Sequence, residues 1–211
     1  HYRQFPKMSD CTVNKMYESI DACPGKKVIA GIKRRVFYIP KSDIAKWPKL
    51  PDVGSEDAKK MGDLAMYIGS FILKAEAYWR HFDLKDNSSG VTWDTAGEIG
   101  SQIIENKATL VMVGPSKEII GFQRQCKNDD LVYVVQEKDG GFHVLGNKDI
   151  YATDSKPSGD LGTEITGAKT CTVAIQVYDD CPAPYYEGDL LLSKDTKLNC
   201  LTGEEEAVAA A

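Results

Sequence analysis

Histidine is scarce in this 211-residue sequence: there are three, and only His81 and His143 could serve a hydrolase as general base. A GxSxG elbow, a GxxxxGK[ST] phosphate loop and a GxGxxG fingerprint are all missing. We therefore expect no catalytic residue, no cofactor site and no enzymatic function. His143 stands between Phe142 and Val144, a pattern that predicts a hydrogen-bonded strand residue.

Close pairs of metal ligands are also missing. The six cysteines lie ten or more residues apart, whereas zinc sites favour thiolates or imidazoles in close pairs. The acidic runs 128–130 and 179–180 lack the alternating ligands and distal glutamate of a calcium loop, so we interpret them as turns and expect no metal site. The dispersed cysteines favour free thiols, and Cys11 with Cys23 is the first pair to test for a disulfide.

The chain has neither a basic surface signature nor a long apolar run. It carries 26 lysines and arginines against 31 acidic residues, a net charge of -5. A nucleic-acid-binding surface normally needs a concentrated basic stripe. The short cluster Lys33-Arg34-Arg35 is more typical of a half-exposed strand. No segment approaches the ~20 apolar residues that span a bilayer, and we expect no membrane partner.

What the sequence does contain is strand patterning. Residues 27–39, KVIAGIKRRVFYI, are rich in β-branched and aromatic residues and end at Pro40. Both faces of this predicted strand carry apolar side chains, so it is either central or covered by a neighbour. We interpret it as a first indication of an assembly surface, with Arg34 and Arg35 as candidate inter-subunit contacts.

The remaining pattern predicts more strands and one helix. Ile119, Phe122 and Cys126 form one apolar stripe after Pro115, which is suited to a first helical position. Alternation of apolar and polar residues predicts strands elsewhere. These predicted strands cover 71–79, 91–95, 98–113, 131–137, 141–146 and 170–178.

Long irregular segments separate these elements: an arm over 1–27, a proline-rich loop over 40–60, a flexible tip over 153–163 and a tail over 182–211. Loops of this length inside compact domains are often functional. Trp47, between prolines, is either a buried plug or an exposed anchor for a partner, and it is the third candidate inter-subunit contact. The combination predicts a non-enzymatic β protein that assembles with other subunits.

The order of elements carries a resemblance. An early strand (KVIAGIKRRVFYIP) is followed by hairpins, a helix between strands (ATLVMVGPSKEIIGFQRQC), and a late strand with a proline turn (CTVAIQVYDDCPAPYYEGD). Over most of residues 25–190 this resembles the tail tube (major tail) proteins of tailed bacteriophages, particularly those of phages or prophages of Bacteroidetes-like hosts. The N-terminal arm and the 40–60 loop are longer than in that pattern.

The resemblance implies a mainly β fold, a β-sandwich or barrel with one short flanking α-helix and long arms and loops. It implies an arm over 1–26, the tail-tube-like domain over 27–190 and an extension with a flexible end over 191–211. It further implies a virion protein, assembled in the bacterial host cytoplasm, whose partners are copies of itself and other tail or neck proteins. Six copies would close a ring, and stacked rings would pass DNA as non-specific cargo. An acidic lumen suits that passage, and the candidate lumen-facing residues are Glu76, Asp94, Glu98 and Glu105.

Two alternatives stay open. The first is another virion component of the neck, ring or connector kind, which would share the assembly chemistry. The second is a secreted β-sandwich with disulfides that binds carbohydrate or protein. The oxidation state of the cysteines and the oligomeric state separate these alternatives.

Overall fold

The computed structural model describes residues 15–150 and 152–210, and the chain is mainly β with a single α-helix. This confirms the fold class that the sequence predicts. In chain order the elements are β1 (Arg35–Pro40), η1 (Lys41–Asp43), β2 (Ile44–Lys46), η2 (Met61–Ala65), β3 (Ile72–Leu73), β4 (Arg80–Asp83), β5 (Gly90–Ala96), β6 (Ile103–Val113), α1 (Lys117–Cys126), β7 (Leu131–Gln136), β8 (Phe142–Leu145), β9 (Asp154–Asp160), β10 (Thr170–Asp179), β11 (Tyr185–Tyr186), β12 (Asp189–Leu191), β13 (Thr196–Asn199) and β14 (Glu204–Ala207).

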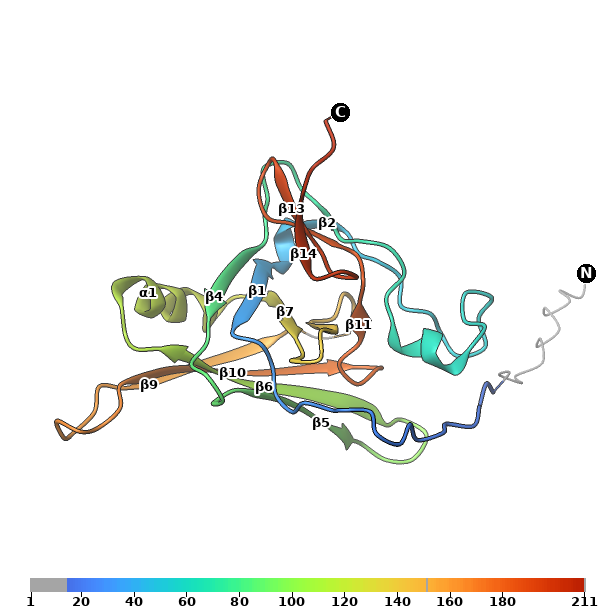
Figure 1. Ribbon diagram of the computed structural model, residues 1–211, viewed down its shortest axis with the longest axis horizontal. Helices are drawn as coiled ribbons and strands as arrows, with labels where there is room; N and C mark the ends of the chain where they lie inside the picture. Colours follow the sequence, from blue (N-terminus) through green and yellow to red (C-terminus); the bar gives the residue numbers. More distant parts are fainter. Residues whose placement is uncertain (1–14, 151, 211) are drawn as a thin grey trace, which may run out of the picture.

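Two antiparallel sheets pack face to face. One has the strand order β11-β8-β7-β1-β4 and the other β5-β6-β10-β9, and Figure 1 shows β1 and β4 running steeply across β6 and β10. Val173, Ile175 and Val177 of β10 point inward and pack in one cluster with Tyr133 and Val135 of β7. Full burial of such a side chain stabilises the fold by roughly 1.5–3 kcal/mol, so the alternation along β10 fixes which face of its sheet is inside.

The inner strand β1, which pairs with β7 on one side and β4 on the other, is covered on both faces by its own chain. Val36 belongs to the core cluster between the two sheets, while Phe37 and Ile39 belong to a second cluster on the opposite face. That second cluster is completed by the loop residues Phe71 and Trp79 and by C-terminal side chains. The interpretation of this two-faced apolar strand as an assembly surface was therefore wrong. No other subunit is needed to cover it.

The C-terminal residues form a third sheet, in the order β12-β13-β14. Leu190, Leu198 and Cys200 lie in the second core cluster. The hydroxyl of Tyr186 donates a hydrogen bond to the Asp189 carbonyl at 2.6 Å and accepts one from the Phe71 amide at 3.1 Å. The strands β12 and β13 and the following Cys200 therefore cover the five-stranded sheet, whereas β14 is exposed. They lie at and beyond the point where the sequence predicts that a C-terminal extension begins.

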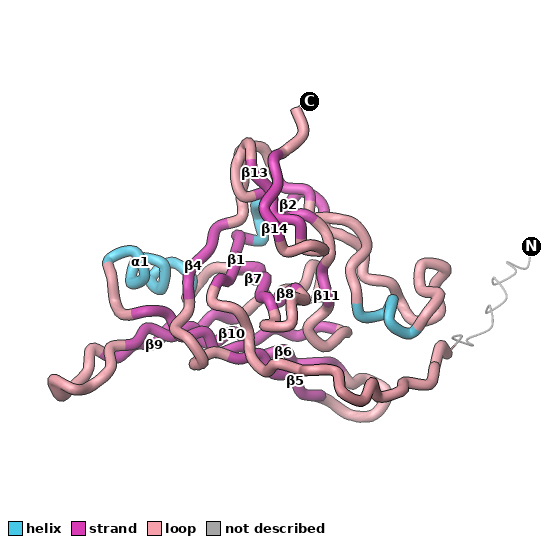
Figure 2. Tube along the Cα trace, in the orientation of Figure 1, coloured by secondary structure: helices cyan, strands magenta, loops and turns pink. Residues whose placement is uncertain are grey.

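The helix α1 closes one end of the sandwich. Ser116 caps it, because its Oγ accepts a hydrogen bond from the Ile119 amide at 3.2 Å; Pro115 precedes this cap. The Phe122 ring lies 4.9 Å from the Tyr38 ring, and Gln123 Nε2 donates to the Ser158 carbonyl of β9 at 2.8 Å. Figure 2 shows the helix above β9, beside a projecting loop.

Several predicted boundaries differ from the structure. The first strand begins at Arg35, and of the eight residues before it only Ile32 makes a β-bridge, to Glu137. Residues 71–79 contain just the two-residue strand β3, because the chain turns at Glu76, whose φ is 59°. The predicted tip over 153–163 instead holds β9, which pairs with β10 along its length, so the projecting tip is 161–169. Apolar alternation could not predict β9, because its few inward residues are small or proline.

Candidate functional site

The four-stranded sheet leaves one face uncovered. Every second residue of its strands points away from the core, and most of these outward positions are polar. Ile103, Val111 and Val113 are the aliphatic exceptions on β6, and Val113 is 54% exposed. Strands as long as β6 and β10 thus carry an apolar inner face and a hydrophilic outer one, which is the pattern of a sheet that meets water on one side. We call this outer surface the open face.

Two of the four candidate lumen residues meet on the open face. Asp94 of β5 and Glu105 of β6 are directly opposite each other in the register. Glu105 accepts a hydrogen bond from Gln176 Nε2 and forms an ion pair with Lys107 Nζ at 3.4 Å. Because Lys107 and Gln176 are also opposite each other, these outward side chains form a connected polar ladder across β6 and β10, and Asp94 lies beside it on β5.

The charge of the open face is mildly acidic. Four strand carboxylates project from it, and two lysines, Lys107 and Lys156, oppose them. The carboxylates are those of Asp94, Glu105, Asp154 and Asp160. The excess of two negative charges would weakly repel a polyanion, and both lysines are already paired with carboxylates.

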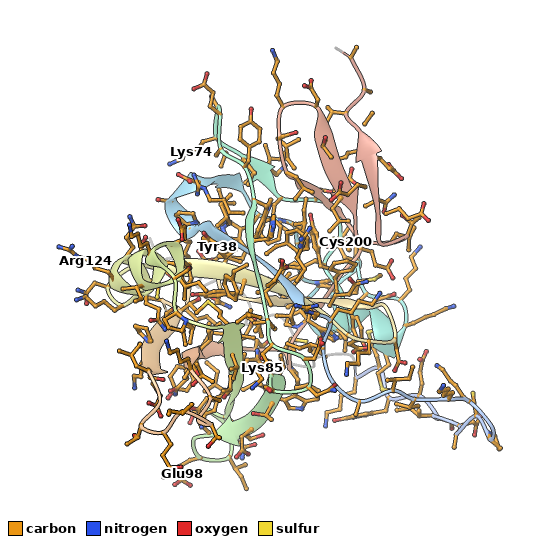
Figure 3. The ribbon with its side chains drawn as sticks, turned by 60° about the vertical axis from the view of Figure 1, so that its left-hand side comes forward. Tyr38, Lys74, Lys85, Glu98, Arg124 and Cys200 are labelled. Atoms are coloured by element: carbon orange, nitrogen blue, oxygen red, sulfur yellow. The ribbon has the colours of Figure 1, made fainter. Side chains whose placement is uncertain are left out.

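The other two candidate lumen residues do not join this ladder. Glu98 lies in the loop between β5 and β6, just beyond the end of the open face. Glu76 lies in a turn two residues after Lys74, and Figure 3 places Lys74 and Glu98 at opposite ends of the molecule. Two residues of chain span at most about 7 Å, so Glu76 is distant from Glu98.

The candidate inter-subunit residues all have partners in their own chain. Arg35 Nε donates to Asp83 Oδ1 at 3.0 Å, and this hydrogen bond lowers the pKa of Asp83. Arg34 Nε donates to the Leu84 carbonyl at 3.2 Å. The Trp47 ring is partly buried and packs edge-on against Phe71 at 5.1 Å. Of the two interpretations of Trp47, the structure supports the plug rather than the free anchor.

Both edges of the four-stranded sheet are free within the described ranges. β5 pairs only with β6, and β9 pairs only with β10. Exposed apolar groups accompany both edges: Trp93 on β5 is 55% exposed, and Ile120 on α1, which packs beside β9, is 53% exposed. The β9 edge escaped the sequence reasoning, although Lys156 and Pro157 are residue types that natural proteins place on edge strands.

His143 is held by hydrogen bonds inside the sandwich. Its Nδ1 lies 2.7 Å from the Ala183 carbonyl, and its Nε2 lies 2.5 Å from Glu137 Oε1. Since a carbonyl only accepts, Nδ1 carries a proton and donates it. Tyr185 also donates to Glu137, at 3.1 Å. This is the hydrogen-bonded strand histidine that the sequence predicts. His81, by contrast, is exposed on β4.

The cysteines Cys126, Cys171, Cys181 and Cys200 are free thiols, and three of the four are buried. Burial raises the pKa of the Cys181 thiol to about 12. The predicted pair Cys11–Cys23 includes Cys11, which lies outside the described residues. Across residues 15–150 and 152–210, no three His, Cys, Asp or Glu side chains gather as metal ligands would.

One carboxylate is buried away from the open face. Asp179, the last residue of β10, is 2% exposed. Burial raises its pKa from 3.8 to about 6, although the Asp180 amide and the Asn147 side chain, both donors to Oδ1, offset part of the rise. In the sequence this residue stands out only as part of the acidic run 179–180, which we interpret as a turn. Only its position at the end of a strand, under neighbouring loops, makes it unusual.

We expect the folding stability to depend on this group. Between pH 4 and 6, approximately, folded Asp179 keeps a proton that the unfolded chain has released, so the free energy of unfolding falls as pH rises through this window. Above about pH 6 the stabilisation from protonated Asp179 is lost. Because the pKa is raised by about two units, this loss lowers the free energy of unfolding by about 3 kcal/mol. Urea unfolding at stepped pH should show that Asp179→Asn removes this decline, whereas Asp180→Asn keeps most of it. Coinciding pH profiles for the wild type and Asp179→Asn would contradict the assignment.

No protein family, curated protein or solved structure matches this chain. In the described part of the chain, no helix is long and apolar enough to cross a membrane. The function is therefore inferred from the geometry of the sheets, edges and cavities.

Proposed function

We propose that this chain is a structural subunit that joins copies of itself, edge to edge, into closed rings. The observation that carries the proposal is the four-stranded sheet, which has one packed face, one hydrophilic face and two free edges. A free edge presents unpaired N–H and C=O groups that a further strand can satisfy. Joining the β5 edge of one copy to the β9 edge of the next would pair the free backbone N–H and C=O groups of both edge strands.

The number of strands is compatible with such a ring. Three antiparallel pairings separate β5 from β9, so these two edge strands run in opposite directions. When a second copy is generated by rotation about an axis parallel to the strands, its β5 therefore runs antiparallel to the β9 of its neighbour. Head-to-tail contacts of this kind close into rings when the rotation is a whole fraction of a turn. Pro157 has no N–H, so the β9 edge offers one donor fewer.

The open face would then become one wall of the ring. We propose that it lines the lumen, where Asp94 and Glu105 stand. A lumen with a small excess of carboxylates would not hold a passing DNA duplex by its phosphates. Combined with the resemblance in element order, this favours a tail tube protein of a tailed bacteriophage, with hexameric rings that stack in the virion and contact other tail or neck proteins.

The projecting segments give such rings material for further contacts. The tip 161–169 carries Leu161 and Ile165, which are strongly exposed, and Figure 1 shows it extending beyond the body of the molecule. The segment 15–30 lies largely exposed, with Tyr17, Ile20 and Val28 all more than three-quarters accessible. We propose that these exposed apolar groups make contacts between rings, where a neighbouring copy would cover them.

Electron microscopy of the purified chain tests the proposal. We expect negatively stained rings with a central hole at high protein concentration, and stacks of rings at higher concentration still. Rings that never stack would favour a neck or connector protein of the virion. A chain that remains monomeric at every concentration would contradict assembly. That result, together with a Cys11–Cys23 disulfide detected by mass spectrometry without reductant, would favour a secreted binding module.

A further inference from the structure

A cavity of about 500 Å³ lies away from the open face. It is formed by the long loop between β2 and β3, by the segment after β8 and by the end of β10. Figure 2 shows how much of this side of the molecule is loop. Much of the cavity wall is apolar, including Trp47, Leu50, Met61, Tyr67 and Ile150. An apolar cavity with a few polar groups is the usual form of a ligand site.

The polar group that stands out in this wall is Asp179. Its Oδ1 accepts hydrogen bonds from the Asp180 amide at 2.7 Å and from Asn147 Nδ2 at 3.0 Å. The Cys181 amide adds a weaker favourable interaction. Its Oδ2 is buried, however, and has no hydrogen-bond partner among the described residues. Most buried polar atoms in proteins are hydrogen-bonded, so an unpartnered carboxylate oxygen indicates a missing donor.

The charge of the cavity wall points to the nature of that donor. The wall contains four aspartates, against the single cation of Lys148. These aspartates are Asp52, Asp149, Asp179 and Asp180. Two aromatic rings, Trp47 and Tyr67, also line the cavity, and the faces of such rings attract organic cations. An excess of three negative charges beside aromatic and aliphatic walls is complementary to a cation with an apolar body.

We infer that this cavity binds an ammonium group carried on an apolar stem, as in an alkyl- or arylalkylamine or a lysine side chain. On binding, the loops that cover Oδ2 would part so that the ammonium can donate a hydrogen bond to it and neutralise the carboxylate, while the stem packs against the apolar wall. A charge-assisted hydrogen bond of this kind is about twice as strong as a neutral one. The inference is independent of ring assembly, because neither edge strand contributes to the cavity.

A cation that pairs with Asp179 must couple binding to pH. The carboxyl is partly protonated near its pKa of about 6, so affinity should rise with pH up to about 7 and then level off. The groups that face it are the Asp180 and Cys181 amides, the Asn147 amide, the Asp180 carboxylate, the Cys181 thiol and the phenol of Tyr67. Burial raises the pKa of Tyr67 well above its usual range, so that phenol stays neutral here. Lys148 and Asp149 are exposed at the rim.

Titration of the full chain with phenethylammonium tests the inference, with 2-phenylethanol as the uncharged probe of equal size. Amide NMR shifts should change around residues 147–150 and 179–182, and the ammonium should bind at least about tenfold more tightly than the alcohol. Asp179→Asn should lower the ammonium affinity by about tenfold and abolish its pH dependence. Asp86→Asn, which alters an exposed carboxylate next to Arg34, should leave the affinity within about twofold.

A second probe, Nα-acetyl-lysine methylamide, distinguishes the two sources of the ammonium. Binding of both cations means that the cavity accepts a lysine side chain, and binding of phenethylammonium alone means that it takes free amines. Equal affinity for the alcohol and the ammonium would overturn the inference. So would unchanged ammonium affinity in Asp179→Asn, or no binding of either cation. Ring formation plays no part in any of these readouts, so they fail or succeed separately from the proposed function.

Discussion

Replacing Trp93 by lysine should abolish ring formation while leaving the monomer folded. Trp93 lies on the free edge strand β5, on the side of the strand that faces the core, and is 55% exposed. It lines a shallow cavity together with Val28 and Ile29. If the β9 edge of a second copy pairs with β5, this indole becomes covered. An inward-pointing charge on an edge strand is a device by which natural proteins prevent edge pairing.

The expected loss of association between copies is large. Buried tryptophans at interfaces commonly contribute 2 kcal/mol or more, and roughly a hundredfold loss of association corresponds to about 2.7 kcal/mol. The monomer should change by no more than about 1 kcal/mol, because the lysine stem can lie along the same surface with its ammonium in water. Analytical ultracentrifugation measures the association, and urea unfolding measures the stability.

Ile72→Lys is the matched control for this experiment. Ile72 is also an apolar strand residue, on β3, and is 53% exposed, but it belongs to neither edge of the four-stranded sheet. Its replacement should leave ring formation intact. If Trp93→Lys and Ile72→Lys assemble equally well, the β5 edge is not the contact between copies.

Replacing Gly188 by alanine should destabilise the fold by roughly 3–4 kcal/mol, at or above the usual range for overpacking. A Cβ at this position would lie 2.6 Å from the Gly69 carbonyl oxygen, 2.6 Å from Ser70 Oγ and 2.7 Å from the Tyr186 hydroxyl. Backbone cannot move aside as a flexible side chain can. Both side-chain groups are also engaged, since Ser70 Oγ accepts from the Asp189 amide at 2.9 Å and the Tyr186 hydroxyl donates to the Asp189 carbonyl.

Denaturant unfolding measures this loss, and Gly62→Ala provides the control. A Cβ on Gly62 meets nothing within 4 Å, so its substitution should change stability by at most about 0.5 kcal/mol. Similar unfolding midpoints for the two variants would mean that the connection between β11 and β12 is not packed as tightly as the structure describes. The connection between β11 and β12 matters because it attaches the three-stranded C-terminal sheet to the five-stranded sheet.

Part of the fold could be predicted from local pattern. The strands β6, β7 and β10 and the helix α1 were predicted within a few residues, except that the predicted strand over 98–113 starts five residues before β6. These elements bury one face or stripe, and the side-chain period of a strand or helix records that burial directly in the sequence. The predictions failed at β9 and over 71–79. At β9 the inward residues are small or proline. Over 71–79 the apolar alternation belongs to a loop that packs on the second core cluster.

The candidate site divides in the same way. Asp94 and Glu105 were assigned together because both lie on predicted hairpin strands, and the register brings them opposite each other. Glu76 was assigned on the same reasoning, but the chain turns there. Arg34, Arg35 and Trp47 were assigned as candidate inter-subunit contacts, and each has a partner in its own chain that lies 24 to 50 residues away. Spacing along the chain could not indicate those partners.

The sequence by itself determined that this protein is mainly β with one helix, acidic, and without a recognisable catalytic motif. Composition is a count over the chain, and periodicity and motifs depend only on residues close together in the sequence, so none of these properties requires the tertiary structure. The tertiary structure alone decided which edges stay free, which face stays open and which carboxylate oxygen is left without a donor. Those properties depend on contacts between distant segments, as when Asn147 meets Asp179 across 32 residues. The free energy of such contacts comes from desolvation and pairing in three dimensions, and no local pattern records it.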